Sequence, residues 1–190
     1  MSANDVKGLA VVLIDNGEIV FSNGYGYRMV EKDLPLQLDT IIYGASLTKA
    51  TFAYFVMQLV DERAIELDRS IADYLPKPLP EYDNYNDLAG DSRWRKLTMR
   101  KLLSHSSGFA NYRRFDPAED NKLRFHFGPG DRYAYSGEGF ELAQFVLEEG
   151  LGLDVGAQMQ TRIFDKLGMN KTSMTWREDF RENYSHNYNV

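Results

Sequence analysis

The feature that most constrains the fold is an apolar segment from Ala50 to Val60, which contains no charged residue. Its apolar side chains lie on every side of a helix rather than along one stripe, which is typical of a helix buried at the centre of a domain. We therefore predict a central helix over residues 46–63, with the rest of the chain packed around it. The small residues Gly44 and Ala45 precede this helix.

Ser46 and Lys49 stand at the start of the predicted helix, one turn apart. Residues i and i+3 share a face of a helix, so the lysine amine can lie beside the serine hydroxyl. A serine hydroxyl is a poor nucleophile until a neighbour takes its proton, and a partly desolvated lysine can help to do so. The N-terminal end of a helix also favours a developing oxyanion. Because S-x-x-K also occurs by chance with a solvated lysine, its meaning depends on the other segments.

The composition excludes several classes of function. The 190 residues include no cysteine, so disulfides, thiolate metal sites and thiol nucleophiles are absent. The net charge is −6 and the basic residues are scattered, which argues against a nucleic-acid-binding surface. The three histidines, His105, His126 and His186, lack the spacing of metal ligands. We expect neither a metal nor another cofactor.

The chain contains no apolar run approaching the ~20 residues of a transmembrane helix, so we expect no membrane span. Residues 1–5 lack the basic and apolar regions of a signal peptide. A predicted strand begins a few residues later, which is also expected of a protein whose N-terminal segment has been removed. These residues do not indicate a compartment.

The N-terminal part, residues 8–45, is predicted to form strands. Leu9–Ile14 and Ile19–Ser22 are short, β-branched runs, and Asn16-Gly17 between them is a strong hairpin turn signal. Residues 33–35 are predicted to be a loop. A two-stranded hairpin is only marginally stable alone, so it requires further partners.

Residues 64–175 are predicted to be mainly helical. Capping residues and apolar stripes predict helices over residues 98–104, 139–149 and 155–166. The polar segment 81–93 is expected to be a surface excursion. Residues 176–190 show no strand pattern and are expected to be a truncated or disordered end. A second chain that completes the sheet is therefore one candidate partner.

Five segments in this order resemble the serine β-lactamase and penicillin-binding-protein-like family, of the class C β-lactamase type, which includes DD-peptidases and β-lactamase-like carboxylesterases. The segments are Leu9–Gly26, Gly44–Ala50, Leu97–Gly108, Phe127–Ser136 and Leu167–Ser173. The resemblance implies an α+β, β-lactamase/transpeptidase-like fold, with a central antiparallel sheet and a helical half. Residues 1–190 would then be a partial domain, the N-terminal portion, without the C-terminal strands and helix.

In this family a tyrosine of a Y-x-N motif shares proton transfer with the lysine near the nucleophile. Tyr135 is the matching residue, because a Pro-Gly turn precedes it and a predicted helix follows. Residues 82–84 have the literal pattern but lie in the proline-rich excursion. The resemblance therefore implies Ser46 as the nucleophile, assisted by Lys49 and Tyr135. A structural alternative for Tyr135 is a buried tyrosine that satisfies a backbone group.

Gly137 and Glu138 follow and are the expected substrate-binding residues. Gly137 stands where the motif has asparagine, and glycine has no amide to bind a substrate carbonyl or to hold Lys49. This departs from β-lactam recognition as in class C enzymes. For Glu138 the structural alternative is an acidic residue in the first turn of its helix. His105 and the K-T-S sequence at Lys171 are interpreted as structural.

The resemblance implies a serine hydrolase that acts on an ester, amide or β-lactam carbonyl of a small molecule or peptide through an acyl-Ser46 intermediate. It also favours a periplasmic or secreted location. The alternative is a catalytically inactive fragment, or a binding or assembly protein on the same scaffold. The K-T-G strand of the family is not present in these 190 residues.

Overall fold

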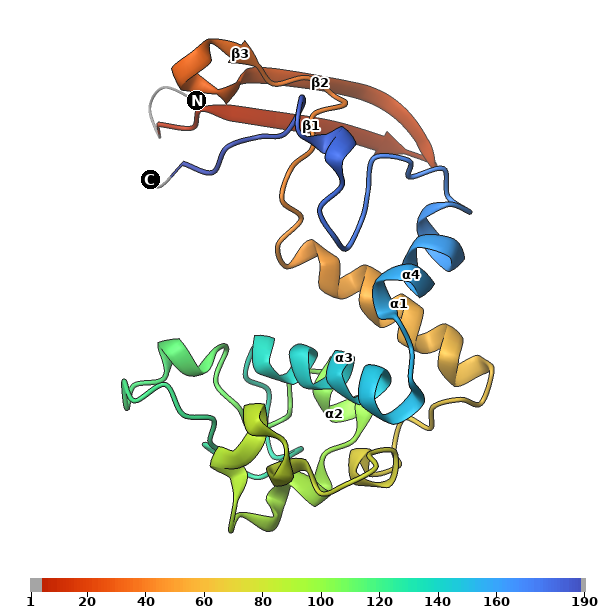
Figure 1. Ribbon diagram of the computed structural model, residues 1–190. Helices are drawn as coiled ribbons and strands as arrows, with labels where there is room; N and C mark the ends of the chain where they lie inside the picture. The colour runs from red at the N-terminus through yellow and green to blue at the C-terminus, as the bar shows by residue number, and fades with distance from the viewer. Residues whose placement is uncertain (1–4, 189–190) are drawn as a thin grey trace. The chain divides into compact units, whose positions relative to one another are not determined.

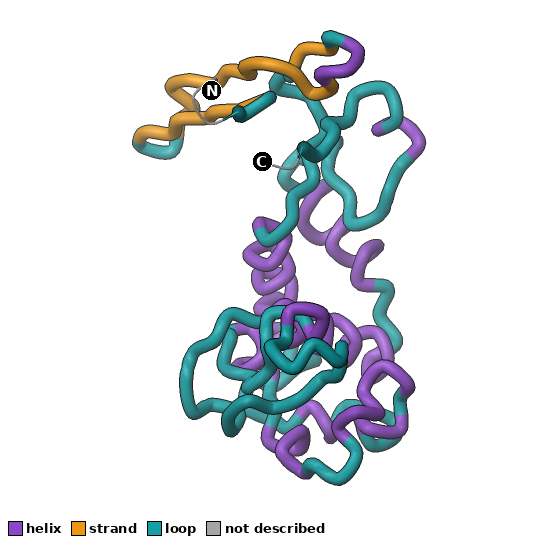
Figure 2. Tube along the Cα trace, turned by 90° about the vertical axis from the view of Figure 1, so that its left-hand side faces the viewer, coloured by secondary structure: helices purple, strands orange, loops and turns teal. Residues whose placement is uncertain are grey.

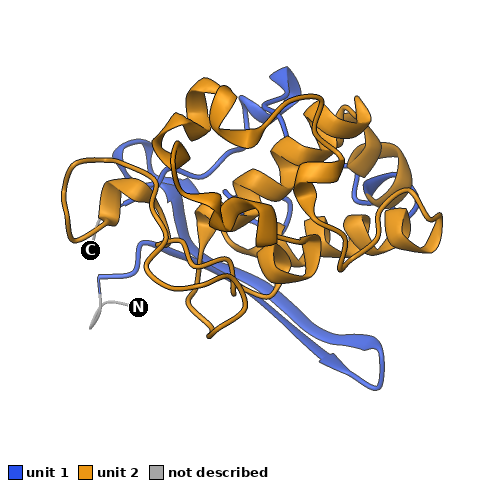
Figure 3. Cartoon of the chain, turned by 90° about the horizontal axis from the view of Figure 1, so that it is seen from below, with its two compact units in different colours: residues 1–45, 164–190 blue, residues 46–163 orange. Residues whose placement is uncertain are grey.

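The computed structural model describes residues 5–188 (Figure 1). The chain divides into two compact units, coloured separately in Figure 3. One unit consists of residues 1–45 together with 164–190, and the other of residues 46–163. The predicted Ser46, Lys49 and Tyr135 all belong to the second unit.

The first unit contains a three-stranded antiparallel sheet in the order β1-β2-β3. β1 (Gly8–Asp15) and β2 (Glu18–Met29) form the predicted hairpin. Asn16 and Gly17 have φ values of 49° and 82°, as a two-residue type I′ turn requires. β3 (Leu34–Pro35) pairs with β2, so the prediction of a loop at residues 33–35 was wrong.

Residues 183–186 form backbone hydrogen bonds with the N-terminal part of the same unit, which the sequence did not indicate, while the expectation of a truncated or disordered end over residues 176–190 stays a prediction. Ile41 and Tyr184 form a parallel bridge, in which Ile41 N–H donates to the Asn183 carbonyl at 2.8 Å and Ser185 N–H donates to the Ile41 carbonyl at 2.8 Å. The pattern was missed because a single bridge has no alternating apolar run. Residues 189–190 lie outside the described residues.

The four α-helices of the described residues begin in the second unit, and helices are purple in Figure 2. Its helices are α1 (Leu47–Asp61), α2 (Met99–Leu103), α3 (Gly137–Leu151) and α4 (Val155–Met159), the last continuing into a π-helical turn, Gln160–Phe164. Shorter 3-10 turns occupy Ile71–Asp73, Leu79–Glu81, Asp83–Leu88, Ser92–Lys96 and Arg113–Phe115. The first unit adds 3-10 turns at Val30–Lys32 and Glu178–Phe180.

Side-chain caps explain where the helices begin. Thr98 Oγ1 accepts the N–H of Lys101 at 3.3 Å, as the sequence predicts for α2. Ser136 Oγ accepts the N–H of Gly139 at 3.0 Å, which starts α3 two residues earlier than predicted. Gly152, with φ 65°, ends α3 in the left-handed conformation that glycine adopts readily.

Helix α1 is buried along one stripe and not all round, contrary to the prediction. Phe52, Phe55, Val56 and Leu59 are buried at helical spacing, whereas Tyr54 on another side is 56% exposed. The excursion at 81–93 is also less superficial than predicted, since its members Tyr85 and Leu88 are buried. The sheet and the helical unit together make an α+β fold, as expected.

Candidate active site

Ser46 is the N-cap residue of α1, but its side chain makes no capping hydrogen bond. Its φ and ψ, −74° and −9°, are already helical, which directs the hydroxyl away from the backbone N–H groups it would otherwise cap. The preceding Ala45 has φ 43°, a left-handed conformation that is uncommon for a residue with a side chain. Such strained residues cluster at functional sites.

The three side chains that the sequence proposed for catalysis converge on one oxygen atom. Lys49 Nζ donates to Ser46 Oγ at 3.2 Å, and Tyr135 Oη donates to the same Oγ at 2.7 Å. Lys49 Nζ also lies 5.2 Å from the centroid of the Tyr135 ring and 5.7 Å from that of Phe140. The serine hydroxyl thus has two possible proton partners, each within hydrogen-bond distance.

Hydrogen bonding with Ser46, and with Lys49 as the donor, lowers the pKa of the Tyr135 phenol below its ordinary value. The charge of Lys49 acts in the same direction, while partial desolvation opposes it. The side chain is 38% exposed, so solvent reaches the site. A phenol with a lowered pKa offers its phenolate form as a base at a pH nearer neutrality.

His105 holds Tyr135 in place from two directions. Its ring centroid lies 4.3 Å from that of Tyr135, and its Nδ1 accepts the N–H of Ser136 at 3.0 Å. Its backbone carbonyl accepts the N–H of Ala134 at 2.8 Å. Burial lowers the pKa of His105, so that its ring is neutral at pH 7. The sequence interpretation of His105 as structural is compatible with these contacts, but nothing in the sequence indicated that it touches Tyr135.

Phe140 is a second residue at the site that sequence reasoning did not single out. It packs against Phe52 of α1 with ring centroids 6.0 Å apart, and against His105 at 5.1 Å. The sequence placed it only in the apolar stripe of its helix. The contact joins α3 to the helix that begins at Ser46.

Glu138 is 3% exposed, and both its carboxylate oxygens are bound by Arg113. Oε1 accepts the backbone N–H of Arg113 at 2.7 Å and its Nε–H at 3.1 Å, and Oε2 accepts its Nη2–H at 2.9 Å. Glu138 lies in the first turn of α3, as the structural alternative for it requires. Contact between Glu138 and a substrate stays a prediction. A substrate group would have to compete with Arg113 for the Glu138 carboxylate.

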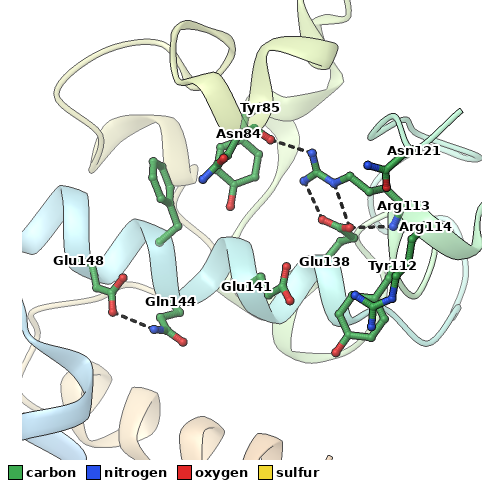
Figure 4. Close-up of a pocket in the computed structure, with 11 residues that line it drawn as sticks. Asn84, Tyr85, Tyr112, Arg113, Arg114, Asn121, Glu138, Glu141, Gln144 and Glu148 are labelled. Carbon is green, nitrogen blue, oxygen red and sulfur yellow. Dashed lines mark hydrogen bonds and ion pairs between the residues drawn. The ribbon is translucent and has the colours of Figure 1, made fainter. Parts of the chain in front are cut away.

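A hollow of about 800 Å³ runs beside α3 (Figure 4). Tyr112, Arg113 and Glu138 line one end, and Gln144 and Glu148 line another part. Figure 4 shows the carboxylate of Glu138 facing the guanidinium of Arg113. Aromatic rings of Tyr85 and Phe145, with centroids 4.9 Å apart, form more of the wall.

The other sequence candidates lie elsewhere. Tyr82 of the literal Y-x-N sequence packs edge-on against Phe145, with centroids 4.9 Å apart. Lys171 of the K-T-S sequence pairs with Asp39 at 2.9 Å within the first unit.

Among residues 5–188, no cluster of three or more histidine, aspartate or glutamate side chains is arranged to hold a metal ion. No helix in this range has the length and apolar character needed to cross a bilayer.

Two curated relatives are similar to this chain over most of its length. A lovastatin esterase from Penicillium rubens is 30% identical over 208 aligned positions, which cover 93% of this chain and 51% of the esterase. A D-aminopeptidase from Gluconobacter oxydans is 26% identical, over 86% of this chain and 32% of that enzyme. The chain therefore spans about half, or less, of the length of these relatives.

Solved structures support the same fold. The octameric penicillin-binding protein homologue from Pyrococcus abyssi superimposes with a TM-score of 0.74 at 25% identity, over 97% of this chain and 44% of that one. A class C β-lactamase superimposes with a TM-score of 0.77 at 21% identity, over 97% and 51% of the two chains. The profile of the family described as Beta-lactamase matches residues 1–190, the full chain. The chain belongs to the Beta-lactamase family, that of the serine β-lactamase and penicillin-binding-protein-like hydrolases.

Proposed function

We propose that this chain carries the nucleophilic site of a serine hydrolase, in which Ser46 attacks the carbonyl carbon of an ester or amide. The observation that supports this most directly is the convergence of Lys49 Nζ and Tyr135 Oη on Ser46 Oγ, at 3.2 and 2.7 Å. A nucleophile and its base within hydrogen-bond reach is the arrangement that activated serines require. Tyr135 and Lys49 are the proton-transfer groups in this proposal.

In the acylation step, the proton of Ser46 Oγ moves to the Tyr135 phenolate as Oγ bonds to the carbonyl carbon. The lowered pKa of Tyr135 favours the phenolate relative to a free tyrosine, and the charge of Lys49 acts in the same direction. The proton then passes to the leaving group as the bond from the carbonyl carbon to that group breaks. The backbone N–H of Ser46, at the start of α1, is one donor to the oxyanion.

Deacylation uses the same groups in reverse. Water attacks the acyl-Ser46 carbonyl, Tyr135 with Lys49 takes the proton from water, and Ser46 Oγ regains a proton as it leaves. Gly137 offers no side-chain amide for a substrate, so esters and simple amides fit this site better than β-lactams. Substrate contacts by Gly137 and Glu138 remain part of the proposal.

The test uses two acylating probes on the 190-residue chain, a fluorescent penicillin and p-nitrophenyl butyrate. The wild type should form a covalent adduct by intact mass spectrometry, or release p-nitrophenol, and Ser46→Ala should do neither. Ser92→Ala, at an exposed serine of a 3-10 turn, is the matched control and should behave as wild type. Absence of any Ser46-dependent adduct or turnover would contradict the proposal and favour the inactive-fragment alternative.

The assembly alternative has one observation of its own. The β1–β2 hairpin keeps large apolar side chains exposed, among them Ile14 at 68% and Ile19 at 67%. Such surfaces often mark interaction sites. The prediction of a second chain that completes the sheet is therefore tested by sizing the protein with light scattering. The prediction would be supported if the wild type is a stable dimer and Ile19→Lys is a monomer. A wild type that is monomeric at all concentrations would contradict the prediction.

A further inference from the structure

The ammonium of Lys49 has no carboxylate partner, since none of the ion pairs within residues 5–188 includes it. Its Nζ donates to Ser46 Oγ at 3.2 Å and lies over two aromatic rings, 5.2 Å from the centroid of Tyr135 and 5.7 Å from that of Phe140. A lysine amine is a point charge on a flexible four-carbon stem. Its position therefore depends on the groups that surround the charge.

Residue 137 does not supply a group that holds Lys49. In the Y-x-N motif of the family an asparagine stands there, and this chain has Gly137. A Cβ atom added to Gly137 would meet Tyr112 Cζ at 2.5 Å, Cε1 at 2.6 Å and Oη at 2.8 Å. These distances are shorter than non-bonded contacts allow, so the Tyr112 ring occupies the space that a side chain at residue 137 would need. An amide at this residue is thus absent from the sequence and is also excluded by the packing.

Phe140 lies one turn after Gly137 on α3, and its ring is held from two sides. The ring centroid lies 6.0 Å from that of Phe52 and 5.1 Å from that of His105. Phe52 is 4% exposed and stands three residues after Lys49 in α1, so the two share a face of that helix. Phe140 is therefore anchored to the face of α1 that carries Lys49.

The face of an aromatic ring attracts an ammonium that lies within about 6 Å of the ring centroid. The rings of Tyr135 and Phe140 both meet this condition for Lys49. A ring face also takes none of the three N–H donors of a lysine in a conventional hydrogen bond, whereas a carboxylate partner would take at least one. The donors of Lys49 thus stay available for the oxygens at the site.

We infer that Phe140 is a positioning residue that holds the Lys49 ammonium beside Ser46 Oγ, in place of the side chain that residue 137 lacks. This inference rests on the proposed function. Tyr135 offers the second ring, but its phenol also transfers protons in that proposal. Phe140 has no polar atom, so it acts on the reaction only through Lys49. Loss of its ring should lower kcat and leave substrate binding almost unchanged.

The kinetic test uses p-nitrophenyl butyrate, after subtraction of the Ser46→Ala background. Phe140→Leu keeps an apolar side chain and removes the ring face, and should lower kcat about three- to thirtyfold with little change in KM. Phe140→Tyr keeps the ring and should retain wild-type kcat. Phe127→Leu is the matched control, because it removes a half-buried ring that stacks on another cation, Arg132, at 4.6 Å. It should also retain wild-type kcat.

Fluorinated phenylalanines at residue 140 separate the charge of the ring face from its packing. Fluorine draws electron density away from the face and changes the size of the ring little, so kcat should fall stepwise from phenylalanine to its mono-, di- and trifluoro forms. The same series at residue 127 should leave kcat unchanged. Ser46-dependent hydrolysis that does not respond to fluorination at residue 140 overturns the inference alone. No Ser46-dependent hydrolysis overturns the proposed function and this inference with it.

A second measurement needs no activity. Hydrogen bonding with Ser46 and Lys49, together with the charge of Lys49, lowers the pKa of the Tyr135 phenol, so displacement of Lys49 should raise that pKa. NMR of protein labelled with carbon-13 at tyrosine Cζ follows this titration, and the Tyr135 signal is the one missing from Tyr135→Phe. In Phe140→Leu the signal should titrate at a higher pH than in the wild type. An unchanged titration would show that Lys49 stays in place without the ring, and would overturn the inference even if kcat falls.

Discussion

Tyr135 donates its phenol proton to the hydroxyl of Ser46 over 2.7 Å, across 89 positions of sequence. The two residues belong to segments that must be brought together by the packing of the helical unit. Phe52 and Phe140 join these segments, and His105 stacks on Tyr135 from the turn after α2. The hydrogen bond therefore depends on the fold of residues 46–163. Its removal should lower the catalytic rate and leave the thermal stability almost unchanged.

Tyr135→Phe removes the phenol oxygen and keeps the ring that stacks on His105. Under the proposed function, kcat for p-nitrophenyl ester hydrolysis should fall about 10²- to 10⁴-fold, the usual contribution of a positioned acid–base group. Thermal unfolding should change little, since the side chain is 38% exposed. Tyr133→Phe should retain wild-type kcat. A Tyr135→Phe variant within threefold of wild type would remove Tyr135 from the mechanism.

The pH dependence of kcat/KM should report the phenolate of Tyr135. Because its pKa is lowered from 10.0, the deprotonated fraction rises at a lower pH than for a free tyrosine. We expect kcat/KM to rise with pH along a limb whose apparent pKa is below 10. Tyr135→Phe should lack this limb, which is measured from initial rates between pH 5 and pH 10. The same limb in the variant would assign it to another group.

The sequence singled out Ser46, Lys49 and Tyr135 as candidates because each lies at a local signal, a helix start or a helix preceded by a Pro-Gly turn. The hairpin and the Thr98 cap were also predictable, because each depends on residues close together in the sequence. The convergence of Lys49 and Tyr135 on Ser46 is consistent with the family resemblance from which Tyr135 was chosen as a candidate.

Contacts between distant segments were not predictable from a single sequence. His105 against Tyr135, Tyr112 against Gly137 and the Ile41–Tyr184 bridge each join residues with no periodic pattern between them. The all-round apolar segment predicted burial of every side of α1, yet Tyr54 is exposed. Hydrophobic periodicity shows which residues are apolar, but not what covers each of them.

His105→Asn tests whether His105 positions Tyr135. Asparagine tolerates the left-handed φ of 56° at this residue, so the backbone should be retained. Loss of the stacked ring should let Tyr135 move, and a displacement near 1 Å lowers catalysis about 10²-fold. The test is kcat against KM with p-nitrophenyl butyrate, where kcat should fall and KM should change little. An unchanged kcat would show that His105 does not position Tyr135.

The stability of the wild type should depend on pH through His105. Its pKa is lowered in the folded state, so below about pH 6.5 the unfolded chain binds more protons than the folded one. The stabilisation is therefore complete above that pH and is lost as the pH falls. Urea unfolding at pH 7 and pH 5 should show a larger loss for the wild type than for His105→Asn. Equal losses would assign the acid sensitivity to other groups.

Arg113→Met tests the ion pair that fixes the segment carrying Tyr112 to α3. Glu138 has a side chain only 4% exposed, and the substitution would leave it without its cation. Breaking a buried pair from one side costs about 3–5 kcal/mol, measured as the free energy of unfolding in urea. Arg181→Met, in the exposed pair with Glu178, is the matched control and should cost less than about 1 kcal/mol.

Because Arg113 also donates to the Asn84 carbonyl at 3.0 Å, its loss should loosen one wall of the hollow as well. Glu138→Gln added to Arg113→Met should recover part of the stability, since the uncompensated charge is then gone. If Arg113→Met costs no more than Arg181→Met, the pair does not hold Tyr112 in place.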